Sequence, residues 1–364
     1  MARRRPAPSR SAAERTEDHY RQAADELARR LEEGTAPWTQ SWRPGENPLP
    51  RNALTGKPYR GGNSIWLASV ARTRGYHDCR WGTFKQALEL GGHVRKGERG
   101  TTVVYWQWET RRQKRDAAGR PQLDKDGQPA YERRKLERPR AYPWTVFNAA
   151  QCDGLPAREA TDARQAGWDP VAAAERVLSG SGAEIEHGSQ DRAYYNLGRD
   201  SIHLPFREQF PDAPSYYNTA LHELGHWSGH PDRLDRETLL RGIREGPSSA
   251  EYAREELRAE IAAMISSDRL ELARQPERHA AYVGHWIKTL REDPRELYRA
   301  AQDAQGISDY VLEFGREREP GREPTAAESR EREPRTAPEP QIPPPAHLPQ
   351  PGSGGQYRMF HKGR

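Results

Sequence analysis

The sequence is poor in cysteine, with only Cys79 and Cys152 among its 364 residues. These two residues form neither a CxxC pair nor a disulfide framework, so they exclude a fold built on disulfides and fit a reducing cytosol. The chain also lacks any run of about 18 apolar residues, and its basic start leads into charged sequence instead of the apolar stretch of a signal peptide. These absences predict a cytoplasmic protein with no membrane partner.

Apolar residues are scarce too, since hydrophobic residues make up 34% of the chain and charged residues 30%. The length allows two domains of about 100–200 residues each, and the 30 prolines, concentrated near the C-terminus, predict disordered flanks. Residues 1–150 carry 30 Lys and Arg against 17 Asp and Glu, whereas the rest carry 28 against 36. The first half is therefore the candidate polyanion binder, although a general enrichment in arginine gives the same excess.

Turn residues and apolar periodicity predict an α+β protein of two domains. In the first domain they predict helices at 17–33, 64–75 and 81–92 and strands at 101–109 and 141–148, joined by a flexible basic hairpin arm. The predicted boundaries are a disordered segment at 1–15, the first domain at 16–150 with its arm at 109–140, a linker at 151–166, the second domain at 167–314 and a disordered tail rich in Pro, Arg and Glu at 315–364.

The second domain is predicted to combine a small sheet with several helices. A helix starts at Pro170, and the last two of three short strands form a hairpin. The predicted strands span 183–187, 192–196 and 201–205, and the helices that follow span 215–229, 250–267, 277–291 and 294–304.

The segment HELGH at 222–226 places His222 and His226 four residues apart, on one face of a helix. Both imidazoles can therefore bind one metal ion, with Glu223 beside them as the general base for hydrolysis of a carbonyl. Zn2+ at such a site takes three protein ligands and keeps one position for water. The alternative is a helix with two solvated histidines, but apolar neighbours such as Leu224 and the upstream hairpin favour a metallopeptidase site.

The third ligand is predicted from a downstream helix. Glu256 and Glu260 lie four residues apart there, which suits Glu256 as a ligand and Glu260 as an acceptor that orients a histidine. Three alternatives stay open. Glu255 is adjacent; HELGHWSGHPD has a metzincin-like spacing that makes Asp232 a ligand, with His230 nearby; and the glutamates also fit a solvated acidic helix face.

Several short segments together are more specific than HExxH alone. YRGGN, WGTFKQALELGGHVRKGERGTTVVYW and VFNAAQCDGLP precede HELGHWSGHPDRLDR and YAREELRAEIAA. In this order, over about residues 16–312, they closely resemble the ArdC-type antirestriction proteins. The same pair of domains occurs in the N-terminal part of TraC-type plasmid primases.

The resemblance implies an N-terminal single-stranded-DNA-binding domain and a zincin-like metallopeptidase domain, encoded on mobile elements and protecting incoming DNA from host restriction. It implies zinc ligands at His222, His226 and Glu256 and a catalytic role for Glu223. A restriction subunit or another DNA-bound protein is the implied peptidase substrate. The resemblance assigns no function to the arm or the tail, and no primase-type catalytic region follows, so polymerisation is not expected.

Single-stranded DNA is bound by cations along the backbone and by aromatic rings that stack on unpaired bases. Cations and rings interleave in KPYRGGN, RWGTFKQ and HVRKGERG. The predicted DNA-binding residues are Lys57, Tyr59, Arg60, Asn63, Arg80, Trp81, Lys85, His93, Arg95, Lys96 and Arg99. Alternatively, the large apolar residues form the core of this domain, namely Trp66, Trp81, Phe84, Val104 and Trp106.

Two other functions are weighed for the second domain. In the first, coating of the strand alone protects the DNA and zinc only stabilises the domain. In the second, the metal site cleaves DNA, but one zinc with two histidines suits carbonyl hydrolysis better than the two-metal carboxylate sites usual for phosphodiesters.

Overall fold

The computed structural model describes residues 11–39, 49–115, 120–124, 127–157, 169–273 and 280–316. Of the segments predicted to be disordered, residues 1–10 and 317–364 lie outside the described residues, as do residues 158–166 of the predicted linker. Within the described ranges, no helix is both long enough and apolar enough to span a bilayer.

Helix α1 (Ala12–Glu32) begins earlier than the sequence predicts, because Ser11 and Glu14 form a capping box. The Ser11 hydroxyl accepts the Glu14 N–H at 3.2 Å, and the Glu14 carboxylate accepts the Ser11 N–H at 2.7 Å. The apolar stripe predicted for this helix is buried, and it includes Tyr20, Ala24, Leu27 and Leu31.

The N-terminal half is built on a four-stranded sheet of order β1-β2-β5-β4. Its strands are β1 (Arg51–Asn52), β2 (Arg80–Gly82), β4 (Thr101–Gln113) and β5 (Tyr131–Asn148), and a second small sheet pairs β3 (His93–Val94) with β6 (Cys152–Asp153). The short helices predicted here are present. They are α2 (Gly61–Thr73) and α3 (Phe84–Glu89), with single turns η1 (Pro37–Thr39) and η2 (Ala149–Gln151).

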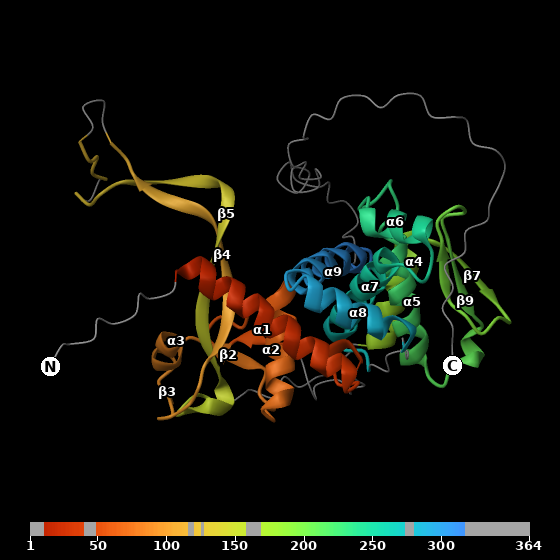
Figure 1. Cartoon of the computed structure of the whole chain (residues 1–364), viewed down its shortest axis with the longest axis horizontal. Coiled ribbons are helices and arrows are strands. Elements are labelled where there is room, and N and C mark those ends of the chain that lie inside the picture. The colour runs from red at the N-terminus through yellow and green to blue at the C-terminus, as the bar shows by residue number, and fades with distance from the viewer. Residues whose placement is uncertain are drawn as a thin grey trace.

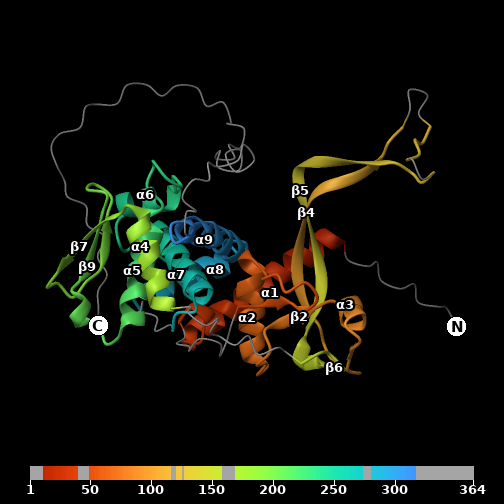
Figure 2. The same cartoon turned by 180° about the vertical axis from the view of Figure 1, so that it is seen from behind.

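Strands β4 and β5 form a long antiparallel hairpin that projects from the body of the molecule (Figure 1; Figure 2). The pairing continues into the predicted arm, as far as Gln113 opposite Tyr131. The register shifts between Gln107 and Glu109, where four residues of β5, including Pro139, have no partner. Such an irregularity bends a hairpin, and both figures show the ribbon turning sharply along this arm.

The C-terminal half is a helical layer with a three-stranded sheet on its outer side (Figure 1). Strand β9 (Ser201–Pro205) lies between β7 (Glu184–Gly188), which is parallel to it, and β8 (Tyr194–Asn196), which forms the predicted hairpin with it. The helices are α4 (Pro170–Ser181), α5 (Ala213–Trp227), α6 (Glu237–Glu245), α7 (Ala250–Leu270), α8 (Ala280–Glu292) and α9 (Glu296–Glu313), with the turn η3 (Arg207–Gln209). Helix α6 was not expected from the sequence.

The two halves pack directly against each other, α1 on α8 and α2 on α9 (Figure 1). His19 Nε2 and the Tyr298 hydroxyl are 2.5 Å apart across this contact. A Cβ atom on Gly62 would lie 2.2 Å from the Tyr298 ring, so α2 approaches α9 this closely only because residue 62 is glycine. Arg60 also pairs with Asp309 of α9. One continuous apolar core therefore runs through both halves, and the α+β, two-domain fold is confirmed.

Candidate metal centre and DNA-binding surface

Helix α5 carries both histidines of the HExxH motif into the interior. Its N-terminus is fixed by Asp212, whose carboxylate accepts the Ser215 N–H at 2.8 Å. Apolar side chains that pack on α7 and α9 bury the rest of the helix. His222 and His226 are 5% and 1% exposed, so neither is a solvated surface histidine.

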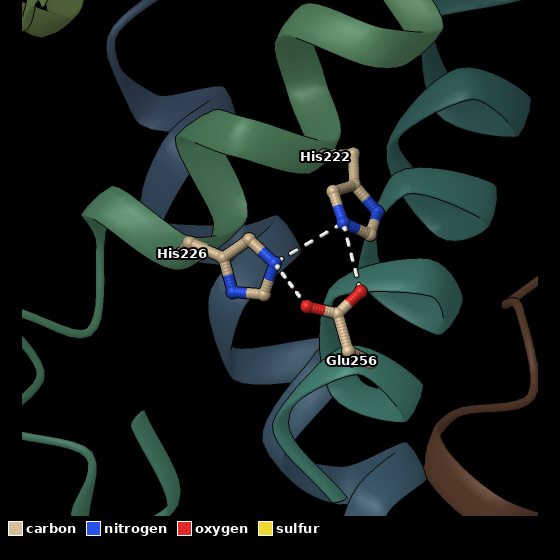
Figure 3. Close-up of side chains that lie close together, drawn as sticks. All are labelled: His222, His226 and Glu256. Carbon is tan, nitrogen blue, oxygen red and sulfur yellow. Dashed lines mark hydrogen bonds and ion pairs between the residues drawn. The ribbon is translucent and has the colours of Figure 1, made fainter. Parts of the chain in front are cut away.

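Glu256 of α7 meets the two imidazoles (Figure 3). The His222 and His226 Nε2 atoms are 3.1 Å apart, and they lie 3.6 Å and 3.3 Å from the two Glu256 oxygens. Ligands at about 2.05 Å in a tetrahedron are separated by about 3.3 Å. The three donors thus have the spacing of a single tetrahedral ion. Among the described residues, they form the one group of side chains whose spacing could hold a metal ion.

Carboxylates occupy the far side of each imidazole. His222 Nδ1 lies 3.4 Å from Glu260, as the sequence predicts, and His226 Nδ1 lies 3.3 Å from Glu255. Arg236 donates to Glu255 at 2.6 Å, and the Thr238 hydroxyl donates to the other oxygen of that carboxylate, also at 2.6 Å. Such acceptors fix the ring orientation and leave Nε2 directed at the ion.

The protonation of the cluster follows from this arrangement. Burial alone lowers the pKa of His226, but the Glu256 and Glu255 carboxylates outweigh it and raise the pKa to about 9. Glu256 and Glu260 likewise raise the pKa of His222 well above its usual value despite its burial. Burial raises the pKa of Glu255, yet Arg236 and His226 bring it well below the usual range. Without a cation, protons therefore balance the carboxylates, and a metal ion must displace them.

Glu223 lies on α5 beside this cluster and is 1% exposed. Asp232, the metzincin-like alternative, is not part of the cluster, because its side chain is 87% exposed and lies 3.5 Å from His230 Nδ1. Glu255 contacts His226 only at Nδ1, the nitrogen turned away from Glu256. Glu256 therefore meets the two histidines at their Nε2 atoms, whereas Asp232 and Glu255 do not.

Arg236 and Thr238 are site residues that the sequence analysis did not identify. Arg236 immediately precedes α6, and Thr238 lies in its first turn. Both therefore reach Glu255 from this helix. The only signal in the sequence is the proximity of an arginine-rich turn, DRLDR, to the histidine helix, and that pattern is common on surfaces.

Seven of the predicted DNA-binding residues are exposed. Two of them, Arg60 and Arg95, form close ion pairs, and the other five form none with the described residues. Lys85 pairs loosely with Glu89 at 3.6 Å. These five lie on the loops and short elements around β1, α3 and β3, and they are Lys57, Lys85, His93, Lys96 and Arg99.

The prediction for Trp81 was wrong. Its ring is 0% exposed within the core, so it cannot stack on a base. Two more predicted residues serve the fold instead: the Tyr59 hydroxyl donates to the Trp81 carbonyl at 3.3 Å, and the Asn63 amide bonds the N–H and the C=O of Val104 at 2.9 Å and 2.7 Å. Sequence pattern alone does not distinguish such aromatic and amide side chains from ligand-binding ones.

Three predicted arginines are committed to ion pairs. Arg80 contacts Asp78 at 2.8 Å, Arg95 contacts Glu98 at 2.8 Å, and Arg60 pairs with Asp309 across the two halves. Neutralised cations attract phosphate less strongly, so these three contribute less to a basic surface than their number suggests.

Three of the five residues in the alternative core are buried. Trp66 and Val104 are buried beside Trp81, whereas Phe84 and Trp106 are exposed. Further exposed rings lie on the β4–β5 hairpin, and none of them was among the predicted DNA-binding residues. They are Tyr105, Trp108, Tyr131 and Trp144.

Two family models match the chain. The model of the N-terminal domain of anti-restriction factor ArdC matches residues 17–147, and that of a zincin-like metallopeptidase matches residues 172–303. A zincin-like domain implies a divalent metal, and the donor spacing described above fits one.

Relatives contain the same pair of domains. A DNA primase TraC of Escherichia coli is 49% identical over 305 residues, which are 83% of this chain and 28% of the primase, so the chain spans little more than a quarter of that relative. The crystal structure of the antirestriction ArdC protein from plasmid R388, metal-free, is 35% identical with a TM-score of 0.62, over 81% of this chain and 97% of that one. The same protein has been crystallised with Mn(II), at 34% identity and the same TM-score.

Proposed function

We propose, because this chain belongs to the ArdC-type antirestriction family, that it binds single-stranded DNA with its N-terminal half and hydrolyses a peptide bond in its C-terminal half. The substrate in this proposal is a protein met on the bound strand, such as a restriction enzyme of the host cell. Hydrolysis then protects DNA that enters the cytoplasm by conjugation. The plasmid-borne relative and both family matches support this proposal.

One observation carries the catalytic part, namely the convergence of His222, His226 and Glu256 at tetrahedral spacing. These residues would hold a divalent ion, for which we propose Zn2+, since imidazole and carboxylate donors in this number suit it. Bound there, the ion would act as a Lewis acid and lower the pKa of a water molecule to about 7.

Glu223 is the proposed general base. It follows His222 directly on α5 and is buried. Its charge, like that of Glu256, acts on Tyr252 and Tyr282. Its carboxylate oxygen takes the proton from the attacking water and returns it to the departing amide nitrogen. The burial of these residues excludes bulk water and strengthens each of these interactions.

Two tyrosines add hydroxyl donors near the same carboxylates. Tyr252 and Tyr282 are hydrogen-bonded to each other, and their rings are 5.4 Å apart. Burial and the charge of Glu256 raise the pKa of Tyr282 to about 12, and they raise that of Tyr252 as well. Both hydroxyls therefore stay protonated at neutral pH and can donate to an oxygen that gains charge during hydrolysis.

A second function is favoured by the burial of the site. Glu256 is 0% and Glu223 1% exposed, and structural zinc sites are closed whereas catalytic ones keep an open position. In this second proposal the ion stabilises the C-terminal half, and binding of the strand alone protects it.

Transfer of a restriction-sensitive plasmid into a restricting host separates the two proposals. Glu223→Gln keeps the size of the side chain but cannot accept a proton. The peptidase proposal predicts that this variant retains its metal and its affinity for oligo-dT and loses protection by about 100-fold or more, the usual contribution of a general base.

Asp232→Asn is the matched control, because it removes a carboxylate outside the cluster and is expected to protect like the wild type. Full protection by Glu223→Gln would overturn the peptidase proposal and leave the binding one. Absence of oligo-dT binding by the wild type would overturn both.

A further inference from the structure

The β4–β5 hairpin exposes aromatic rings to an extent unusual for a folded domain. Tyr105 is 58% exposed, Trp144 53%, Trp108 52% and Trp106 41%. Single exposed apolar residues need no explanation, but several large rings grouped on one projecting element mark an interaction surface.

The strand register shows which of these rings share a face. Tyr105 is directly opposite Tyr142, and Val103 is directly opposite Trp144. Directly opposed residues point to the same side of a sheet, and so do residues two apart on one strand. Tyr105, Tyr142 and Trp144 therefore form one surface, here called the hairpin aromatic face.

Two rings of this face hold each other in place. The Tyr105 and Trp144 ring centroids are 6.3 Å apart, with an interplanar angle of 69°. This edge-to-face contact restricts both rotamers before any ligand binds. Less side-chain entropy is then lost when a ligand stacks on either ring.

Cations continue the surface outward. Arg140 is opposite Gln107, the next pair on the same side after Tyr105 and Tyr142, and it is exposed. Beyond the register shift, the exposed cations of the two strands taken together outnumber their acidic residues. Among the cations described there, Arg133 lies near a carboxylate, 3.9 Å from Glu109. The exposed cations of the two strands are Arg112, Arg133, Arg134, Lys135, Arg138 and Arg140.

We propose that the hairpin aromatic face is a stacking platform for single-stranded DNA, with the arm cations along its phosphates. This inference rests on the proposed DNA binding and names its surface. Exposed rings beside cations suit unpaired bases, whose faces are free, whereas the bases of a duplex are stacked on each other. An acidic protein partner would form ion pairs with the cations, but it has no bases to stack on fixed, exposed rings.

The test is binding of a fluorescent oligo-dT strand to the full chain, followed by anisotropy over a range of salt concentrations. Tyr105→Ala with Trp144→Ala is expected to weaken binding by about 10-fold or more, since base stacking on each ring contributes substantially. The salt slope stays unchanged, because no cation is removed. Tyr105→Phe with Trp144→Phe keeps both rings and is expected to restore most of the affinity.

Two further variants make the result specific. Arg140→Gln is expected to lower both the affinity and the salt slope. Phe206→Ala removes a ring that is 45% exposed in the C-terminal half and is expected to bind like the wild type. A strand with 2-aminopurine in place of one base reports stacking directly, and its fluorescence is expected to be quenched by the wild type and not by the alanine pair.

The outcomes separate this inference from the function on which it rests. No binding of oligo-dT by the wild type would overturn the proposed function itself. Wild-type affinity and quenching in the alanine pair would overturn only the platform. If that pair binds DNA normally but loses protection, the face contacts a protein instead, and the inference is overturned as well.

Discussion

Each histidine of the metal cluster is held from two sides. Glu260 and Glu255 lie at the Nδ1 atoms of His222 and His226, and Glu256 lies at both Nε2 atoms. The tautomer needed for metal binding is therefore fixed by neighbouring carboxylates. At the scale of single residues, α7 contributes as much to this centre as the HExxH helix does.

Asp268 is a mostly buried carboxyl group that links the two halves. Its Oδ1 accepts the Leu49 backbone N–H at 3.0 Å. Burial raises the pKa of Asp268 from 3.8 to about 6, against the effect of the Leu49 bond. The folded state thus holds this proton more tightly than the unfolded state does. Stability is lost as the pH rises from about 4 to about 6, and the loss is complete above that.

Asp268→Asn keeps an acceptor for Leu49 and removes the charge. Two pKa units correspond to about 3 kcal/mol, so the free energy of unfolding is expected to rise by up to that amount at pH 7.5 and not at pH 4. Urea unfolding at the two pH values measures this, with the exposed Asp232→Asn as the control. An equal change at both pH values would contradict the account.

The proximity of His222, His226 and Glu256 could be predicted from sequence because helical spacing determines which residues share a face. His222 with His226, and Glu256 with Glu260, are each four apart on regular helices. The environment of Trp81 could not be predicted in this way. The sequence predicts a helix over 81–92, whereas Trp81 lies in β2, a strand of three residues that is too short for an alternating pattern to be recognised.

At the scale of elements, the β4 edge is covered where it leaves the body. The Asn63 side chain on α2 bonds both backbone groups of Val104, and the Trp66 indole N–H donates to the Thr102 carbonyl at 3.0 Å. An uncovered edge strand invites pairing with other chains. Helix α2 thus joins the hairpin to the body of the molecule.

Asn63→Ala is expected to lower the free energy of unfolding by about 1–3 kcal/mol, since two backbone groups lose their partner. The affinity of the folded protein for oligo-dT is expected to stay the same. Lys57→Ala is the converse control. It is expected to lower the affinity for oligo-dT and to leave the free energy of unfolding unchanged. If Asn63→Ala instead weakened DNA binding at unchanged stability, the DNA-binding role predicted from the sequence would be correct.

Elements with a clear apolar pattern were predicted well, and highly charged ones were predicted less completely. Strands β8 and β9 and helices α5 and α7 lie where the sequence places them. Helix α6 was not predicted, because it has only nine residues and lies in a segment rich in Arg and Glu. The hairpin arm was predicted, but the extent of its regular pairing was not, because consecutive cations at 111–112 and 133–135 leave no apolar face on this part of the two strands.

At the scale of the whole molecule, the basic half and the acidic half form one body. Residues 1–150 hold the excess of cations, and α1 and α2 of this half pack on α8 and α9 of the other. A strand bound to the hairpin would therefore be kept at a fixed distance from the metal cluster. This packing could not be predicted from sequence, because the turn-rich composition of 151–166 suggests a linker and contains no sign of contacts made elsewhere.

The central claim is that His222, His226 and Glu256 together hold one divalent ion. Calorimetric titration of the metal-stripped protein with Zn2+, and separately with Mn2+, tests it most directly. One ion per chain is expected for the wild type and for Asp232→Asn. An affinity for the ion at least 100-fold lower is expected for Glu256→Gln, because this variant lacks a metal ligand and not merely a residue that orients one. Unchanged affinity in Glu256→Gln together with a loss in Asp232→Asn would contradict it.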